Sequence, residues 1–104
     1  MTEQKQIAET IMCQITTGDA WCFAAVGARD YMALDANEVR RGGLMFRVTI
    51  KPGQTHKIVI DLTNDDLYYV NLIRIRGTEV FHEGDEECDC ETLAKTVYKL
   101  CHQA

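Results

Sequence analysis

Long apolar runs are missing from this sequence of 104 residues. Its longest uncharged runs have nine residues, as at Ala20 to Ala28, whereas a helix that crosses a membrane needs about 20. The first residues, Met-Thr-Glu-Gln-Lys-Gln, also lack the basic and then apolar pattern of a signal peptide. We therefore expect a protein that stays in the cytoplasm and does not associate with membranes.

The sequence also lacks an even number of cysteines and a phosphate-binding loop. The chain has five cysteines, and because this number is odd and no export is expected, we predict reduced thiols. Gly42-Gly43 follows two arginines but lacks the Gly-Lys-Ser/Thr ending of a phosphate loop. A disulfide-stabilised secreted protein and a nucleotide-binding P-loop protein are therefore not expected.

The sequence does contain enough apolar residues for one packed core. Hydrophobic residues make up 46% of the chain and aromatic residues 8%, which is typical of globular proteins and not of disordered ones. A chain of this length normally forms one domain. We expect a single domain over residues 1–104 that folds without a metal ion or other cofactor.

Charge is distributed unevenly along the chain, although the net charge is −5. The segment from Val39 to Ile60 contains basic residues and no acid, namely Arg40, Arg41, Arg47, Lys51 and Lys57. The segment from Glu79 to Glu91 contains acids and no base, namely Glu79, Glu83, Asp85, Glu86, Glu87, Asp89 and Glu91. The molecule is therefore expected to have a basic region and an acidic region.

Two segments have the apolar spacing of amphipathic helices. In residues 3–16, with Thr2 as a cap, apolar side chains recur every three or four positions from Ile7 to Ile15. Residues 89–102 show the same spacing from Leu93 to Leu100. These segments are predicted to be the first and last elements of the fold.

Between the helices the pattern changes to that of strands. Strands are predicted at residues 21–26, 31–34, 44–50, 57–62, 67–76 and 80–82. The segment 21–26 is apolar at both parities, as in a strand covered on both faces, whereas 44–50 and 57–62 alternate and flank Pro52-Gly53, a type II turn sequence. Gly84 is expected to end the sheet.

This order of elements predicts an α+β fold. It has an N-terminal helix, a five- to six-stranded mainly antiparallel sheet and a C-terminal helix, with the helices packed on one sheet face.

The ending Cys-Asp-Cys-Glu…Cys-His contains several types of metal ligand but has the wrong spacing for zinc. On one helix, Cys90 and Cys101 would be about 16 Å apart at 1.5 Å per residue, too far to bind one ion. Cys88 and Cys90, even with His82, lack a second ligand pair. No metal ligand is therefore assigned, while a redox or metal role for Cys88 and Cys90 stays open.

Catalytic candidates are few, and none is assigned. They are Asp61, Asp65, Asp66, His56, His82 and His102. Asp65-Asp66 falls in an expected turn, where aspartate is common because it hydrogen-bonds to the backbone. We therefore expect a protein that is not an enzyme, and keep a small metal-dependent enzyme as an alternative.

A second alternative is a nucleic-acid-binding accessory module. The basic residues from Arg40 to Lys57 would contact phosphates and Tyr68 or Tyr69 would stack on bases. The net negative charge disfavours direct nucleic-acid binding.

Four short stretches of the sequence resemble a group of small bacteriophage and prophage accessory proteins of unknown function. They are Ile7-Ala8-Glu9-Thr10-Ile11, Gly27-Ala28-Arg29-Asp30, Asp66-Leu67-Tyr68-Tyr69-Val70 and Ile73-Arg74-Ile75-Arg76-Gly77-Thr78-Glu79. Lys and Asn would be usual at Arg29 and Asp30. The resemblance implies a phage-borne protein made in the cytoplasm of a bacterial host, and it assigns no site residue.

Together these features favour non-enzymatic protein–protein interaction. Small acidic phage proteins often inhibit host machinery, so the sharpest form of the hypothesis is an inhibitor of a defence complex such as CRISPR or restriction machinery. The predicted binding face is the acidic segment from Glu79 to Glu91, and the expected partner is a host protein or nucleoprotein complex with a basic surface. Homodimerisation is left open.

Overall fold

The computed structural model covers the whole chain and describes residues 2–38, 40–50, 53–63, 65 and 67–103. In chain order the elements found there are α1 (Thr2–Gly18), α2 (Cys22–Val26), β1 (Arg29–Leu34), β2 (Gly42–Val48), β3 (Thr55–Leu62), β4 (Tyr68–Arg76), β5 (Glu79–Cys88) and α3 (Leu93–Gln103). The strands form one antiparallel sheet in the order β1-β2-β3-β4-β5. The predicted α+β class, with helices at both ends of the sheet region, is confirmed.

The β2–β3 hairpin has the register that the alternating sequence predicted. Phe46 pairs with Ile58 and Arg47 with Lys57. Gly53 has a φ of 77°, which glycine adopts without steric strain. Lys51 and Pro52 lie outside the described residues, so the predicted turn type stays a prediction.

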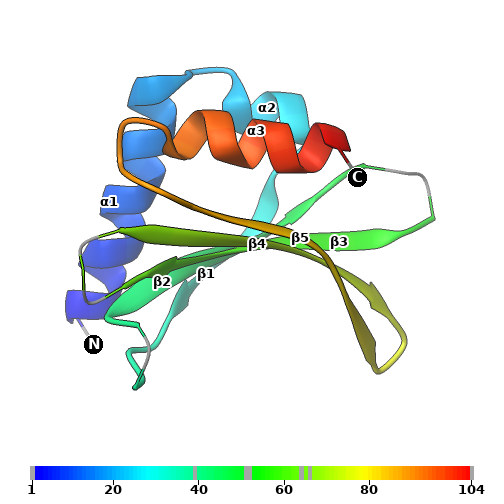
Figure 1. Cartoon of the computed structure of the whole chain (residues 1–104), viewed down its shortest axis with the longest axis horizontal. Helices are drawn as coiled ribbons and strands as arrows, with labels where there is room; N and C mark the ends of the chain where they lie inside the picture. Colours follow the sequence, from blue (N-terminus) through cyan, green and yellow to red (C-terminus); the bar gives the residue numbers. More distant parts are fainter. Residues whose placement is uncertain (1, 39, 51–52, 64, 66, 104) are drawn as a thin grey trace.

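The two predicted helices, α1 and α3, pack on one side of the sheet, as expected, and α2 lies on the same side against both of them (Figure 1). The core lies between these two layers, where Ile11 of α1, Phe46 of β2, Ile58 of β3 and Val97 of α3 are fully buried. Buried residues recur about every 3.6 positions in a helix and every second position in a strand when each buries one face. Among the described residues, no helix is long and apolar enough to span a membrane.

The prediction of a strand at 21–26 is wrong, because these residues form the short helix α2. Gly27 ends this helix in the left-handed conformation with a φ of 65°. Cys22 and Val26 lie four residues apart and are both buried. An apolar run of this length fits either a strand covered on both faces or a short helix. Here it forms a helix that packs against α3.

The predicted end of the sheet at Gly84 and the predicted start of the last helix at residue 89 are also wrong. β5 continues to Cys88, and α3 begins at Leu93. Gly84 lies within the strand, where a Cβ atom would approach Leu100 Cδ2 to 3.3 Å, so glycine permits the close approach of α3. Pairing with β4 outweighs the low strand preference of the acidic residues.

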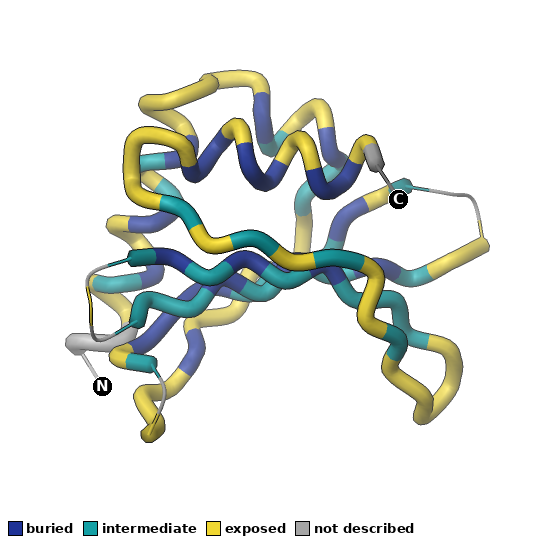
Figure 2. Tube along the Cα trace, in the orientation of Figure 1, coloured by how far each residue is buried: buried dark blue, intermediate teal, exposed yellow. Residues whose placement is uncertain are grey.

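The side of the sheet that carries no helix is called the open face. Residues whose side chains point to it include Met45, Arg47, Lys57, Val59, Ile73 and Ile75. The β4–β5 hairpin bends away from the helices toward the open side, and its tip is exposed (Figures 1 and 2).

Candidate protein interaction surface

The predicted acidic binding residues lie on β5, the edge strand of the sheet, and in the turn that follows it. Among the strands that the structure describes, β5 pairs with β4 alone, so no described strand pairs with its outer backbone edge. Because successive strand residues point to opposite faces, the acids are divided between two sides. Asp85 and Glu87 lie on the open face, opposite Asn71 and Tyr69, whereas Glu86 points toward α3.

Two of the seven acids have counter-ions, which the sequence did not indicate. Glu83 accepts a 2.7 Å hydrogen bond from Arg74 Nε, and Glu86 accepts a 2.9 Å bond from Lys99 Nζ. The side-chain hydrogen bond from Lys99 lowers the pKa of Glu86. The segment from Glu79 to Glu91 contains no base of its own, and the bases that pair with these two acids come from β4 and α3.

Two more acids have local structural roles. The Tyr69 hydroxyl donates to Asp85, and His82 Nε2 lies 3.7 Å from the same carboxylate. Asp89 accepts hydrogen bonds from the Thr92 hydroxyl and from the backbone N–H groups of Glu91 and Thr92. The Thr92 side-chain bond is the main reason that the pKa of Asp89 is lowered.

Glu79, Glu87 and Glu91 remain exposed. None of them has an ion pair with a residue that the structure describes. They extend from the tip of the β4–β5 hairpin to the turn before α3. These three carboxylates are the part of the acidic segment that is free to meet a partner.

The basic residues proposed for nucleic-acid binding do not form one continuous surface. Arg40 makes a 3.0 Å ion pair with Asp61, and its Nε donates to the backbone oxygen of Asp35. Arg47 makes a 3.2 Å ion pair with Asp30. Arg41 is exposed and directly precedes β2, and Lys51 lies outside the described residues.

The two tyrosines proposed for base stacking are engaged within the protein. Tyr68 is 4% exposed, and its hydroxyl donates to Gln14 of α1. Tyr69 is half-buried and donates to Asp85. A surface that stacks bases needs exposed aromatic faces, and Tyr68 does not supply one.

The cysteines are not gathered into one site. Cys13 and Cys90 are exposed, whereas Cys22 and Cys101 are buried, and burial raises their thiol pKa values to about 11 and about 12. Cys88 ends β5, where burial raises its pKa. Cys90, which the predicted helix 89–102 included, lies in the turn before α3.

The catalytic candidates are spread over β3, β5, α3 and the segment between β3 and β4. His56 is buried on β3, His82 is exposed on β5, and His102 stacks on Tyr98 of α3 with ring centroids 3.9 Å apart. Asp61 is engaged by Arg40, and Asp66 lies outside the described residues. In the described part of the chain, no group of three or more His, Cys, Asp or Glu side chains could hold a metal ion.

The sequence reasoning missed an apolar patch on the open face. Met32, Met45 and Val59 lie side by side across β1, β2 and β3. Ile73 and Ile75 extend the patch on β4. Met45 and Val59 occupy the alternate positions of the strands predicted at 44–50 and 57–62, so the available signal was apolar side chains at both parities of these strands.

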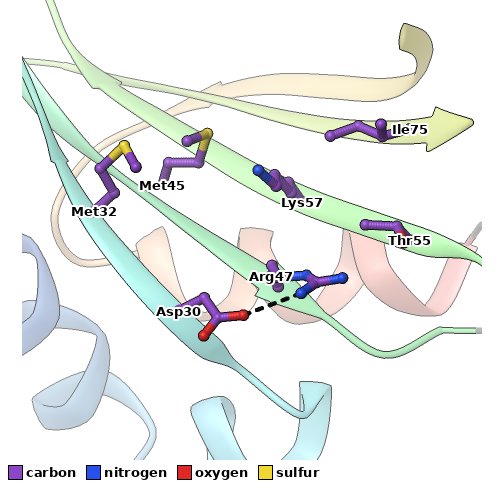
Figure 3. A pocket seen from close by; sticks show the side chains of 7 residues that line it. All are labelled: Asp30, Met32, Met45, Arg47, Thr55, Lys57 and Ile75. Carbon is purple, nitrogen blue, oxygen red and sulfur yellow. Dashed lines mark hydrogen bonds and ion pairs between the residues drawn. The ribbon is translucent and has the colours of Figure 1, made fainter. Parts of the chain in front are cut away.

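A shallow hollow of about 340 Å³ lies on this face. It is lined by Asp30, Met32, Met45, Arg47, Thr55, Lys57 and Ile75 (Figure 3). The chain thus has two surface features that suit a macromolecular partner, an acidic edge strand and an uncovered, partly apolar sheet face. Comparisons with protein-family models, curated proteins and solved structures found no match.

Proposed function

We propose that this protein acts by non-enzymatic protein–protein interaction, through the acidic segment of β5 and the following turn. The observation that carries the proposal is the position of Glu79, Glu87 and Glu91. They are exposed along an edge strand and the turn that follows it, and they have no ion pair with a described residue. Their like charges repel one another, and a basic partner would relieve that repulsion.

The edge strand adds a second means of recognition. An unpaired strand presents backbone N–H and C=O groups that another extended segment can use. Acidic side chains on such an edge oppose pairing with a second acidic strand, and they favour a basic one. The same acids would protect the edge from aggregation, so partner binding must be tested separately from solubility.

The proposed partner is a host protein or nucleoprotein complex with a basic surface, met in the cytoplasm of a bacterium. This part rests on the resemblance to small phage proteins and on the charge of β5. Its sharpest form is an inhibitor of a CRISPR or restriction complex, whose carboxylates compete with nucleic-acid phosphates for Lys and Arg side chains.

The test is a pull-down from bacterial host lysate with the tagged full chain, followed by mass spectrometry. The triple variant Glu79→Lys, Glu87→Lys and Glu91→Lys should lose the captured protein, and added salt should weaken wild-type capture steeply. A matched control reverses three exposed acids elsewhere, namely Glu9, Asp35 and Glu38. Equal capture by both triple variants, each with an unchanged melting temperature, would contradict the proposal.

The two alternatives give different results in simple assays. A nucleic-acid-binding module would be retained on DNA or heparin at moderate salt. A metal-dependent enzyme would carry a bound metal after purification. No contact described above favours either of them over the interaction hypothesis.

A further inference from the structure

The two edge strands of the sheet offer different surfaces to a partner. On β1 the register shifts between Arg29 and Met32, and Asp30 has a positive φ of 57°. A bulge of this kind twists an edge away from further pairing. On β5 the register also shifts once, next to Gly84, but the segment from Gly84 to Cys88 pairs with β4 without interruption. This segment, called the straight edge, is the part of the sheet to which another strand can be added.

A groove of about 270 Å³ lies between the straight edge and α3. Residues 86–88 of β5 line one side of it, and Thr92, Lys95, Thr96 and Lys99 line the other. The described residues that line it include none from β4, so the groove lies along the outer side of β5, below α3 in Figure 1. An edge strand with a groove beside it is the arrangement in which an extended peptide joins a sheet, and the groove takes alternate side chains of the peptide.

The acids of the straight edge that point to the open face are two positions apart. They are Asp85 and Glu87, and both are exposed. In an added strand, two side chains of the same face would lie directly opposite these carboxylates, because side chains alternate in every strand. Opposite charges in such cross-strand pairs are stabilising and like charges are destabilising. The straight edge therefore favours basic residues at two alternate positions of the added strand.

The residue between those two basic positions would point the other way, into the groove. Glu86, on that side of β5, already has Lys99 as its counter-ion, and Lys95 lines the same groove. A third basic side chain would therefore meet two amines and one neutralised carboxylate. A small uncharged side chain can instead enter beside Thr92 and Thr96.

We infer that the partner meets this protein through an extended segment that adds to the straight edge of β5 as a further strand of the sheet. The segment has basic residues at two alternate positions, opposite Asp85 and Glu87, and a small uncharged residue between them. Backbone hydrogen bonds to β5 supply affinity, and the alternation of side chains supplies specificity. The inference rests on the proposed function, because it names the form in which a basic partner binds the acidic segment.

The first experiment is an NMR titration of the isotope-labelled full chain with two short peptides, each acetylated at one end and amidated at the other. Both contain two arginines among threonines and valines, and they have the same composition and charge. The arginines are two positions apart in the alternating peptide and adjacent in the other. The alternating peptide should bind at least about fivefold more tightly, and it should slow amide hydrogen exchange at alternate residues of the straight edge.

The second experiment tests the two acids with a matched control. Asp85→Lys with Glu87→Lys should weaken binding of the alternating peptide at least about tenfold. Asp35→Lys with Glu38→Lys changes the net charge by the same amount at exposed positions between β1 and β2, and it should change the affinity by less than about threefold. Circular dichroism and melting curves establish that each variant is folded.

The third experiment tests the backbone hydrogen bonds. N-methylation of every second residue of the alternating peptide removes the N–H donors along one side of its strand. Two complementary methylation patterns cover the two sides. Only one side pairs with β5, so one methylated peptide should lose binding and the other should retain it.

Equal affinities of the alternating and adjacent peptides, or equal effects of the two methylation patterns, overturn the inference. If both peptides bind alike and both are lost with Asp85→Lys and Glu87→Lys, the acidic segment binds basic partners in another form and the proposed function stands. Absence of binding by either peptide up to about 5 mM also overturns the inference, whereas the pull-down with the triple variant decides the proposed function independently.

Discussion

The two faces of the sheet differ in what covers them, although the same strands supply both. Phe46 points toward the helices and is fully buried, whereas its neighbour Met45 points to the open face and is half-buried. On the covered face the helices of the same chain complete the core. The open face shows that strand alternation alone does not make the second side polar, and its apolar residues are available to a partner.

The largest expected effect comes from truncating Phe46 and Met45, which are neighbours in β2 but point to opposite faces of the sheet. Phe46→Ala should lower the free energy of unfolding by about 3 to 5 kcal/mol, because it leaves a cavity in the core. Met45→Ala should cost about 1 kcal/mol or less, measured where the protein is monomeric. Urea unfolding of both variants gives the two values. Similar losses would show that the open face is as important to folding as the core.

The next largest effect concerns thiol reactivity. Cys13 and Cys90 should be alkylated first, because both are exposed. The pKa of Cys22 rises from 9.0 to about 11, which leaves about 100-fold less thiolate near neutral pH, and burial also blocks access. Cys101, with a pKa of about 12, should behave likewise. Mass mapping after brief alkylation decides the order, and early labelling of Cys22 or Cys101 would contradict the packing of α2 and α3.

A smaller effect is expected from the ion pair that ties the acidic edge to the covered face. Lys99→Ala removes the hydrogen bond that lowers the pKa of Glu86. A lowered carboxyl pKa stabilises the fold above the ordinary value of 4.5, and this stabilisation is lost as the pH falls through the lowered pKa. The variant should therefore melt slightly below the wild type at pH 7, and the gap should close in acid. Lys95→Ala, on an exposed neighbouring position of α3, is the control.

The smallest expected effect is that of a chelator or a reductant. Apolar packing between the sheet and the helices accounts for the fold, so neither reagent should shift the melting temperature beyond measurement error. A drop of many degrees with the chelator would instead indicate a structural metal. Thermal unfolding with and without each reagent makes the comparison.

Several elements were predictable because their periodicity agrees with their packing. The first helix, the β2–β3 hairpin and β4 each bury one regular side, and the sequence pattern follows it. The segment 21–26 was not predictable in this way, since an apolar run is compatible with a strand and with a short helix. β5 was underestimated because acidic residues have a low strand preference, which pairing with β4 outweighs.

The candidate site, too, was predictable from the sequence only in part. The acidic segment and the basic segment could be read directly, because charge is a property of each residue. The partners of Glu83 and Glu86 could not be predicted, since Arg74 and Lys99 approach them only through strand pairing and through the packing of α3. The same is true of Arg29, Arg47 and Lys57, which only the strand register places at neighbouring positions of β1, β2 and β3.

The sequence by itself determined that this is an α+β protein with an apolar core, one acidic segment and one basic segment, because these properties depend on composition and on local periodicity. Only the tertiary structure decided which charges are neutralised and which side of the sheet is left uncovered. The physical reason is that ion pairs and exposed patches depend on contacts between residues distant in the chain, which periodicity within one segment does not contain.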